Sequence, residues 1–528
     1  MIGYKPTFIR PFFVVLLFLA GILLTTPFTI VVQAQDQKQV PDITNITIRN
    51  LSNTVESSVD PLLLADKTGI VHLFWSEDVG GRASLGGTTA GNTIMYSRWD
   101  GVNWSTPVDI LLSPLDATAS SFGDPKSWQP EGVIDDQGII HLIWLGQYPE
   151  KLYYSFAPAA TAGSASSWST PAILASDSTG SQYSTDIEYI APNTLHIVYA
   201  RVHWETQYSG DQPRSLAYLR SIDGGQTWSE PQEIAVVPDP DRGYSNVRLL
   251  KAPEARLFAS WTEWDTSGNG QAVYVARSLD NGDTWNQPVK LAERAPIDYE
   301  RDWMQLAWLE GDRLVAVWEG GFRAYRQFMY SDDNGLTWSE AEDRFYWLIG
   351  DNGFPVFVRD SADNLHFFVA QRIREGSIGR AGSLGLWHSV WLGGTKWTDA
   401  ELVGGGNDMV FISAAVVSGN NLVVVWYASS HGEIMAMNAT IAGVPAIPPE
   451  PWPTAILENP VSEATAVPLE TDPLPPTTTE TSIPNNLAQT SSSSPVNVGS
   501  PIIIALVPTL LIIVVVSFLR FRILHTRT

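Results

Sequence analysis

The sequence predicts an all-β fold, a β-propeller built from four-stranded antiparallel blades. The first observation behind this prediction is a short phrase, rich in β-branched and aromatic residues, that recurs along the chain. Because each copy is short and follows a cluster of turn residues, it predicts a buried strand and not a helix. The copies lie at 70–75, 139–144, 194–199, 256–261, 313–318, 364–369 and 421–426.

The second observation is that each phrase has neighbours that also repeat. A strand-like segment precedes it, as at 61–65, and another follows, as at 93–98. A turn and a short apolar strand then complete the unit, as at 104–111. Four strands per unit, repeated in this way, are typical of a propeller.

Counting the phrase favours seven blades, with six as the alternative. The last unit supplies only three strands, within 412–441. The strand-like segment 43–51 at the start of the domain is free to provide the fourth. We therefore expect a propeller over 43–441 in which the two ends of the domain meet in one blade.

The third observation is a frame, Ser-x-Asp-x-Gly-x-Thr-Trp, at 221–228, 278–285 and 331–338. The carboxylates of Asp223, Asp280 and Asp333 are suited to accept hydrogen bonds from the amides of their own turn, and the glycine is suited to positive φ. The tryptophan then buries a large ring beside the next strand. We interpret the three aspartates as determinants of the fold and not as catalysts.

These three segments resemble the Asp-box, or BNR repeat, of the sialidase (neuraminidase) superfamily, whose fold is a β-propeller. The resemblance implies a retaining glycoside hydrolase of terminal sialic-acid-like sugars, with three arginines for the sugar carboxylate, a Tyr nucleophile activated by Glu, and an Asp acid/base. The Phe/Tyr-Arg-Ile-Pro motif of active sialidases is not found, since the first blade begins Val59-Asp60-Pro61-Leu62-Leu63. The resemblance is therefore specific for structure, and catalytic positions do not transfer.

In a four-stranded blade, the Asp-box turns and the turns between strands one and two share one face. The opposite face carries longer loops with charges and rings, which suit a sugar. The alternative for each residue is a solvated rim. The candidate substrate-binding residues are Arg301, Trp303, Arg323, Arg372 and Glu263; the candidate catalytic residues are Asp78, Asp302, Tyr325 and Tyr427; and the connections into the blades add Gln129, Glu131, Tyr183, Asp186 and Glu188.

Composition excludes several classes of function. A formal net charge of −24 would repel phosphate backbones, so we expect no nucleic acid partner. The absence of cysteine excludes disulfides and thiol catalysis. We expect no metal site and no cofactor. Four histidines occupy matching positions of different blades, which indicates packing and hydrogen bonding: His72, His141, His196 and His366.

The two ends of the sequence suggest export and anchoring. Residues 1–34 are typical of a cleaved signal peptide, with an uncleaved signal anchor as the alternative. Residues 445–500, rich in Pro, Ser and Thr, predict a disordered stalk. The apolar segment 501–519 has the length of a transmembrane helix, and the basic tail 520–528 would lie inside. We expect a single-pass protein of the cell membrane with an extracytoplasmic propeller.

The resulting hypothesis is a cell-surface, sialidase-like propeller that binds glycans or glycoproteins, with hydrolysis left open. The alternatives are a non-catalytic glycan-binding adhesin or receptor, and a protein-interaction scaffold. A cluster of three arginines with a Tyr–Glu pair in one central pocket would favour the enzyme.

Overall fold

The computed structural model describes residues 40–53, 57–78, 92–113, 127–146, 151–178, 183–202, 213–296, 298, 300–321, 323–350, 353–375, 380–406 and 408–453. The predicted signal peptide, transmembrane helix and basic tail lie outside the described residues, as does the predicted stalk from 454 onward. Within these ranges, no helix has the length and apolar character needed to span a bilayer.

The described chain forms seven antiparallel sheets, which are the blades of a propeller. Blade 1 contains β2 (Ser58–Ala65), β3 (Val71–Asp78), β4 (Asn92–Trp99) and β5 (Val108–Leu111). Blade 2 contains β6 (Trp128–Ile134), β7 (Ile139–Leu145), β8 (Leu152–Pro158) and β9 (Ala172–Ala175), with 3-10 turns η1 (Ala159–Thr161) and η2 (Ala165–Ser167). Blade 3 contains β10 (Thr185–Ile190), β11 (Thr194–Val202), β12 (Pro213–Ser221) and β13 (Gln232–Val236).

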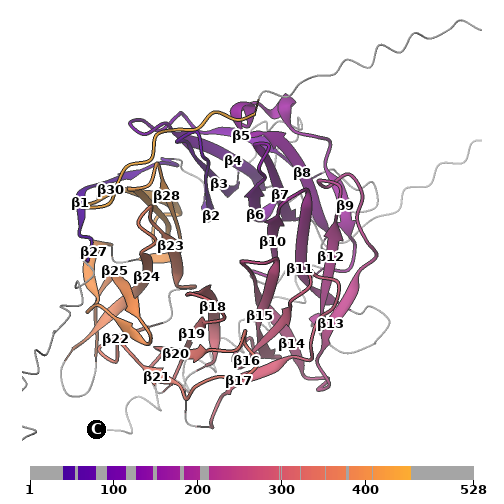
Figure 1. Cartoon of the computed structure of the whole chain (residues 1–528), viewed down its shortest axis with the longest axis vertical. Coiled ribbons are helices and arrows are strands. Elements are labelled where there is room, and N and C mark those ends of the chain that lie inside the picture. Colours follow the sequence, from indigo (N-terminus) through magenta and orange to yellow (C-terminus); the bar gives the residue numbers. More distant parts are fainter. Residues whose placement is uncertain are drawn as a thin grey trace, which may run out of the picture. The chain divides into compact units, whose positions relative to one another are not determined.

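The chain continues around the ring in the same order. Blade 4 contains β14 (Arg242–Ala252), β15 (Arg256–Asp265), β16 (Gly270–Ser278) and β17 (Val289–Glu293). Blade 5 contains β18 (Asp302–Trp308), β19 (Leu314–Gly320), β20 (Tyr325–Ser331) and β21 (Glu342–Asp343). Blade 6 contains β22 (Leu348–Ile349), β23 (Val356–Arg359), β24 (Leu365–Glu375), β25 (Arg380–Gly393), β26 (Lys396–Trp397) and β27 (Glu401–Gly405). In Figure 1, β2, β6 and β10 lie on the inside of the ring and β5, β9 and β13 on the outside.

The seventh blade joins the two ends of the domain. It contains β28 (Met409–Val417), β29 (Asn421–Ala428) and β30 (Glu433–Ile441), and its outer strand is β1 (Ile43–Asn50). The antiparallel register of β1 and β30 pairs Ile43 with Ile441 and Asn50 with Met435. The prediction of seven blades, closed by the segment 43–51, is confirmed, and the alternative of six is wrong.

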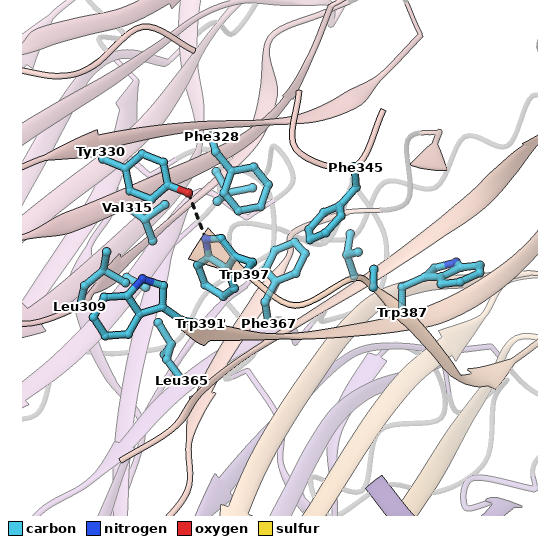
Figure 2. Packing of buried hydrophobic residues seen from close by; sticks show 14 of the residues in the cluster. Leu309, Val315, Phe328, Tyr330, Phe345, Leu365, Phe367, Trp387, Trp391 and Trp397 are labelled. Carbon is cyan, nitrogen blue, oxygen red and sulfur yellow. Dashed lines mark hydrogen bonds between the residues drawn. The ribbon is translucent and has the colours of Figure 1, made fainter. Parts of the chain in front are cut away.

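The core lies between neighbouring blades because the second strands are apolar on both faces. In the interface of blades 5 and 6, Phe328 and Phe367 are fully buried with ring centres 5.5 Å apart. Trp397, next to the final turn of blade 6, donates its indole N–H to the Tyr330 hydroxyl of blade 5 at 3.0 Å. Figure 2 shows this bond and the rings around it. Trp397 thus fastens blade 6 to blade 5.

The four matching histidines are buried hydrogen-bonding residues, as predicted. His72, His141 and His196 each place Nδ1 2.7 or 2.8 Å from a tyrosine hydroxyl on the next strand of the same blade. In blade 6 the partner of His366 is His388. Burial lowers the pKa of His196 to about 4, so its imidazole is neutral.

After β30 the chain lies across the turns that join first and second strands. We call residues 442–453 the strap; Figure 1 shows it in yellow, leaving β30 toward β5. Ile447 donates its amide to Ser418 O of blade 7, and Glu450 donates to Lys67 O of blade 1 at 2.7 Å. Trp452 then covers Gly138 of blade 2. Residues 445–453, within the predicted stalk, therefore pack on the propeller.

Candidate functional site

The Asp-box turns are built for structure. In the turn of blade 3, Asp223 accepts hydrogen bonds from the Thr227 amide at 2.9 Å and from the Thr227 hydroxyl at 2.5 Å, and Ser221 donates to it at 2.8 Å. The turns of blades 4 and 5 repeat this pattern around Asp280 and Asp333. These carboxylates find their hydrogen-bond partners within their own turns. We therefore expect the functional site in another part of the fold.

The Asp-box turns share a face with the turns between first and second strands, which we call the Asp-box face. The Gly224 amide donates to Asn193 O of the neighbouring turn at 2.8 Å, and Asn334 does the same to Asp312 O. The innermost strands end on this face. They begin on the opposite face, which we call the loop face.

Where the innermost strands begin, every blade has a residue with positive φ. Five of these residues sit in a β-bulge, and Tyr183 and Gly353 come just before the innermost strand of their blades. The bulge residues are Asp60, Gln129, Asn246, Trp303 and Phe411. A left-handed residue other than glycine is uncommon, and bulges re-aim side chains near functional sites. The loop-face end of the axis is therefore the candidate position of a site.

These re-aimed residues bind one another from blade to blade. Asp60 Oδ2 accepts the Gln129 amide at 3.3 Å, and Gln129 Oε1 accepts the Tyr183 amide at 2.8 Å. The Tyr183 hydroxyl donates to Asp60 Oδ1 at 3.2 Å. Residues from blades 1, 2 and 3 are thereby held in one network.

An aromatic cluster lies at the same level, and we call it the plug: Tyr183, Trp303, Phe354 and Phe411. The rings of Trp303 and Phe354 meet edge to face with centres 5.1 Å apart, and Tyr183 meets Phe354 in the same way at 5.4 Å. Tyr183, Trp303 and Phe354 are only 6 or 7% exposed. Blades 3, 5, 6 and 7 thus meet at one point on the axis.

Next to the plug is a cavity of about 290 Å³, which we call the chamber. Its walls come from the innermost strands of all seven blades and include Leu64, Gln305 and Phe357. Its ionisable side chains are Asp60, Glu131, Asp186, Glu188 and Arg248. Arg248 donates to Glu131 Oε1 at 2.9 Å, and its guanidinium lies 3.9 Å from the centre of the Phe354 ring. A cation–π contact of this kind ties the chamber to the plug.

Burial shifts the titration of the chamber carboxyls. It raises the pKa of Asp60 to about 6 despite the bonds from Tyr183 and Gln129, and that of Glu188 to about 7 despite Lys251. Burial also raises the pKa of Glu131 and of Asp186, against the attraction of Arg248. The charged form of each is disfavoured because water is partly excluded and donors are few.

Comparisons with known proteins were made at three levels. No family model and no curated protein matches the sequence. Similar solved structures include the Hadza microbial sialidase Hz136, at 16% identity and a TM-score of 0.42, over 74% of this chain and 66% of that one. The NanB sialidase from Streptococcus pneumoniae is 13% identical with a TM-score of 0.42, over 76% of this chain and 71% of that one. The intramolecular trans-sialidase from Ruminococcus gnavus is 12% identical with a TM-score of 0.39, over 75% of this chain and 97% of that one.

The fold fits a sialidase-like propeller. Its blades and its Asp-box turns establish this independently of those likenesses, which carry nothing about activity. This chain spans less than two thirds of the length of the first of those structures.

Three of the predicted site residues lie together between blades 4 and 5. Arg301 is 6% exposed and forms an ion pair with Asp298 at 2.7 Å. Asp302, 4% exposed, accepts from the Trp264 indole at 3.2 Å and from the Asn246 amide. Trp303 belongs to the plug. The side chains of Asp302 and Trp303 contact other blades, whereas the ion pair of Arg301 lies within the connection between blades 4 and 5.

The remaining predicted residues lie elsewhere. Glu263 accepts the Tyr274 hydroxyl at 3.1 Å in blade 4. Tyr325 and Arg323 are half-buried in blade 5, where Tyr325 accepts from Arg374 of blade 6 at 3.3 Å.

Arg372 follows Phe368 and Ala370, so alternation along β24 directs it to the side of blade 7. Tyr427 packs between blades 7 and 1. Asp78 ends β3, but its side chain lies outside the described part. Among the described residues, no group of three or more His, Asp or Glu side chains is arranged around a metal position.

Sequence reasoning missed Asp60 and Arg248, and it placed Glu131, Asp186 and Glu188 around a central depression on the loop face, whereas the structure places them in the walls of the chamber. One signal for Asp60 was available. Three of the left-handed or plug residues precede a proline, as Asp60-Pro61, Gln129-Pro130 and Phe354-Pro355. A proline disfavours the helical region for the residue before it, so a recurring X-Pro at the start of innermost strands indicates a special backbone position.

Proposed function

We propose that this protein is a glycan-binding propeller whose chamber takes up the end of a sugar chain. The observation that carries the proposal is the chamber itself, an axial cavity of about 290 Å³ with convergent ionisable groups beside apolar walls. Small-molecule sites are concave, start at about 300 Å³ and combine apolar walls with a few placed polar groups. Carboxyl groups beside a guanidinium suit the hydroxyls of a sugar, which both donate and accept.

The charge of the walls favours a neutral sugar or an amino sugar. Asp60, Glu131, Asp186 and Glu188 face Arg248 in the chamber, and Lys251 adds one cation beside Glu188. Even with some carboxyls protonated, the chamber has no excess positive charge to hold the carboxylate of a sialic acid. The proposal therefore departs from the sialic-acid-like substrate that the Asp-box resemblance implies.

The protonation state of the buried tyrosines favours binding without hydrolysis. A tyrosine nucleophile needs an activated hydroxyl. Tyr183 donates to Asp60 and Tyr274 donates to Glu263, but burial, reinforced by those same carboxylates, raises the pKa of both tyrosines. Both hydroxyls are therefore held in the neutral form. An adhesin or receptor is our first choice among the functions considered.

Hydrolysis is the second candidate, and one observation favours it. Burial raises the pKa of Glu188 to about 7, and the general acid of a glycosidase requires a carboxyl with a raised pKa. In that case the product released from a glycan would report the activity directly.

We also propose that the propeller acts outside the cytoplasmic membrane, on the sequence of the two termini alone. Protease added to intact spheroplasts should remove the propeller and leave the tail 520–528 protected. A protected propeller with a digested tail would reverse the proposed orientation.

The test of function is a titration of the full-length protein against neutral, amino and sialylated oligosaccharides, with released sugar assayed in parallel. Glu188→Gln should weaken binding at least tenfold, because a hydrogen bond to a charged group contributes about 1.5 to 3 kcal/mol. Glu340→Gln, an exposed position of blade 5, is the matched control.

Three results decide between the functions. Binding to none of the sugars would favour a protein-interaction scaffold over glycan recognition. Release of sugar, lost in Glu188→Gln, would establish the hydrolase. A preference for sialylated sugars would contradict the argument from charge.

A further inference from the structure

The loop-face end of the axial channel is lined by both buried and half-buried side chains. Gln129 is 6% exposed, and Asn246 and Met304 are fully buried. Asp60 and Phe411, which also stand where innermost strands begin, are half-buried. The contacts among the rings of the plug, and not the burial of every residue there, therefore distinguish this end.

The loop-face end is closed by direct contacts around the ring. The plug brings four rings from four blades together, with Tyr183 and Phe411 centred 5.0 Å apart and Trp303 and Phe411 5.5 Å apart. Arg248 covers the chamber side of the plug through its stacking on Phe354. The Val247 amide donates to Tyr183 O at 2.8 Å and fixes the backbone between blades 3 and 4.

A second cavity, of about 410 Å³, adjoins the chamber on the other side. The two cavities share four wall residues, Glu188, Leu249, Gln305 and Phe357. The second cavity continues to residues at the ends of the innermost strands, among them Lys251, Trp308 and Arg359. The Lys251 side chain is 50% exposed. These are positions of the Asp-box face.

The walls of this second cavity are held in place. Arg359 donates to the carbonyls of Trp308 and Leu309 at 2.6 and 2.7 Å, and its guanidinium lies 5.0 Å from the centre of the Trp308 ring. Lys251 donates to Tyr189 O at 3.0 Å and lies 3.6 Å from Glu188 at the boundary of the two cavities. A fixed ring and two cations thus line the approach to the chamber.

We infer that ligands reach the chamber from the Asp-box face, past Lys251 and Trp308, and that the plug closes the loop face to them. The route reverses the sequence-based prediction, which placed the ligand at the loop-face mouth. The nature of the ligand, a neutral or amino sugar, rests on the proposed function; the route does not.

The absence of cysteine from the chain allows a direct test of the route. Gln305→Cys in the full-length protein places one thiol in the wall shared by both cavities, and its rate of modification by a small charged methanethiosulfonate reports access. Lys251→Trp narrows the Asp-box end, and Phe411→Trp enlarges the plug. We expect Lys251→Trp to slow modification at least tenfold and Phe411→Trp to change it less than twofold.

Several outcomes would overturn the route. These are the reverse pattern, equal slowing by both substitutions, or a thiol that reacts only after denaturation. Should Gln305→Cys fail to fold, Leu64→Cys reports from the opposite wall of the chamber.

A final experiment tests the route and the nature of the ligand independently of each other. Saturating amino or neutral oligosaccharide should slow modification of the introduced thiol. Modification that Lys251→Trp slows but that no sugar slows would support the route and count against glycan binding.

Discussion

The carboxylates of the Asp-box turns and those of the chamber differ in their hydrogen-bond donors and in their burial. Asp223 and Asp333 accept bonds from serine, threonine and backbone amides, and these bonds lower the pKa of each to about 2. Glu188 and Asp60 lie in the chamber, where burial raises the pKa to about 7 and about 6.

The difference teaches that position decides what an acidic residue does in this fold. In the turns the charge stabilises the backbone, because each oxygen has donors fixed four residues away or less. In the chamber, burial makes a charged carboxylate unfavourable. The protein therefore keeps these residues at the expense of its folding stability. Groups kept at such a cost are candidates for function.

The largest effect should come from breaking the ion pair of the chamber. Arg248→Met leaves Glu131 without its guanidinium and removes the stacking on Phe354. Removing one partner of a buried pair costs about 3 to 5 kcal/mol, so we expect a loss of that size in urea unfolding. Adding Glu131→Gln to Arg248→Met should recover part of it. A loss below 1 kcal/mol would mean that the pair is effectively solvated.

The dependence of stability on pH should reflect both the chamber carboxyls and the Asp-box carboxylates. Because the pKa values of the chamber carboxyls are raised on folding, stability falls as pH rises from about 4.5 through 7. Because those of Asp223 and Asp333 are lowered, stability also falls as pH drops from about 4 to about 2. Melting temperature should therefore peak near pH 4 to 5. Glu188→Gln should flatten the upper limb, and a peak above pH 7 would contradict the assignment.

A smaller effect is expected where the strap meets the Asp-box face. A Cβ on Gly138 would lie 2.4 Å from the Trp452 ring, whereas a Cβ on Gly311, a glycine in the turn between the first and second strands of blade 5, has nothing within 4 Å. Both glycines have positive φ, so alanine costs about 1 to 2 kcal/mol of strain at either. Gly138→Ala should lower the melting temperature further than Gly311→Ala. The excess should vanish when Trp452→Ala is present.

The smallest change in this set is Asp280→Ala. Its carboxylate accepts from Thr284 and Ser278 in its own turn, and loss of such a cap costs on the order of 1 to 2 kcal/mol. Glycan affinity should stay unchanged, because the residue is outside the chamber. Unaltered stability with abolished binding would assign the Asp-box turns a direct part in the site.

The sequence by itself favoured seven blades over six and predicted their closure and the structural role of the Asp-box. These features depend on local chemistry: alternating β-rich strands, turn residues at fixed offsets, and a segment at 43–51 that had no other partner. In blade 1, Ser97 and Trp104 match the ends of the frame but Trp99 takes the place of its aspartate. The next residue, Asp100, accepts the amides of Val102 and Asn103 in the turn instead.

Only the tertiary structure decided which carboxyls meet on the axis and how the axis is closed. The bulges turn Asp60, Trp303 and Phe411 out of the regular alternation, so the period of two no longer tells which way their side chains point. The partners are also far apart in the chain, as Asp60 is from Tyr183 and Glu131 from Arg248. Local pattern fixes each blade, but the contents of the channel depend on how seven blades meet, because every side chain there faces residues from other blades.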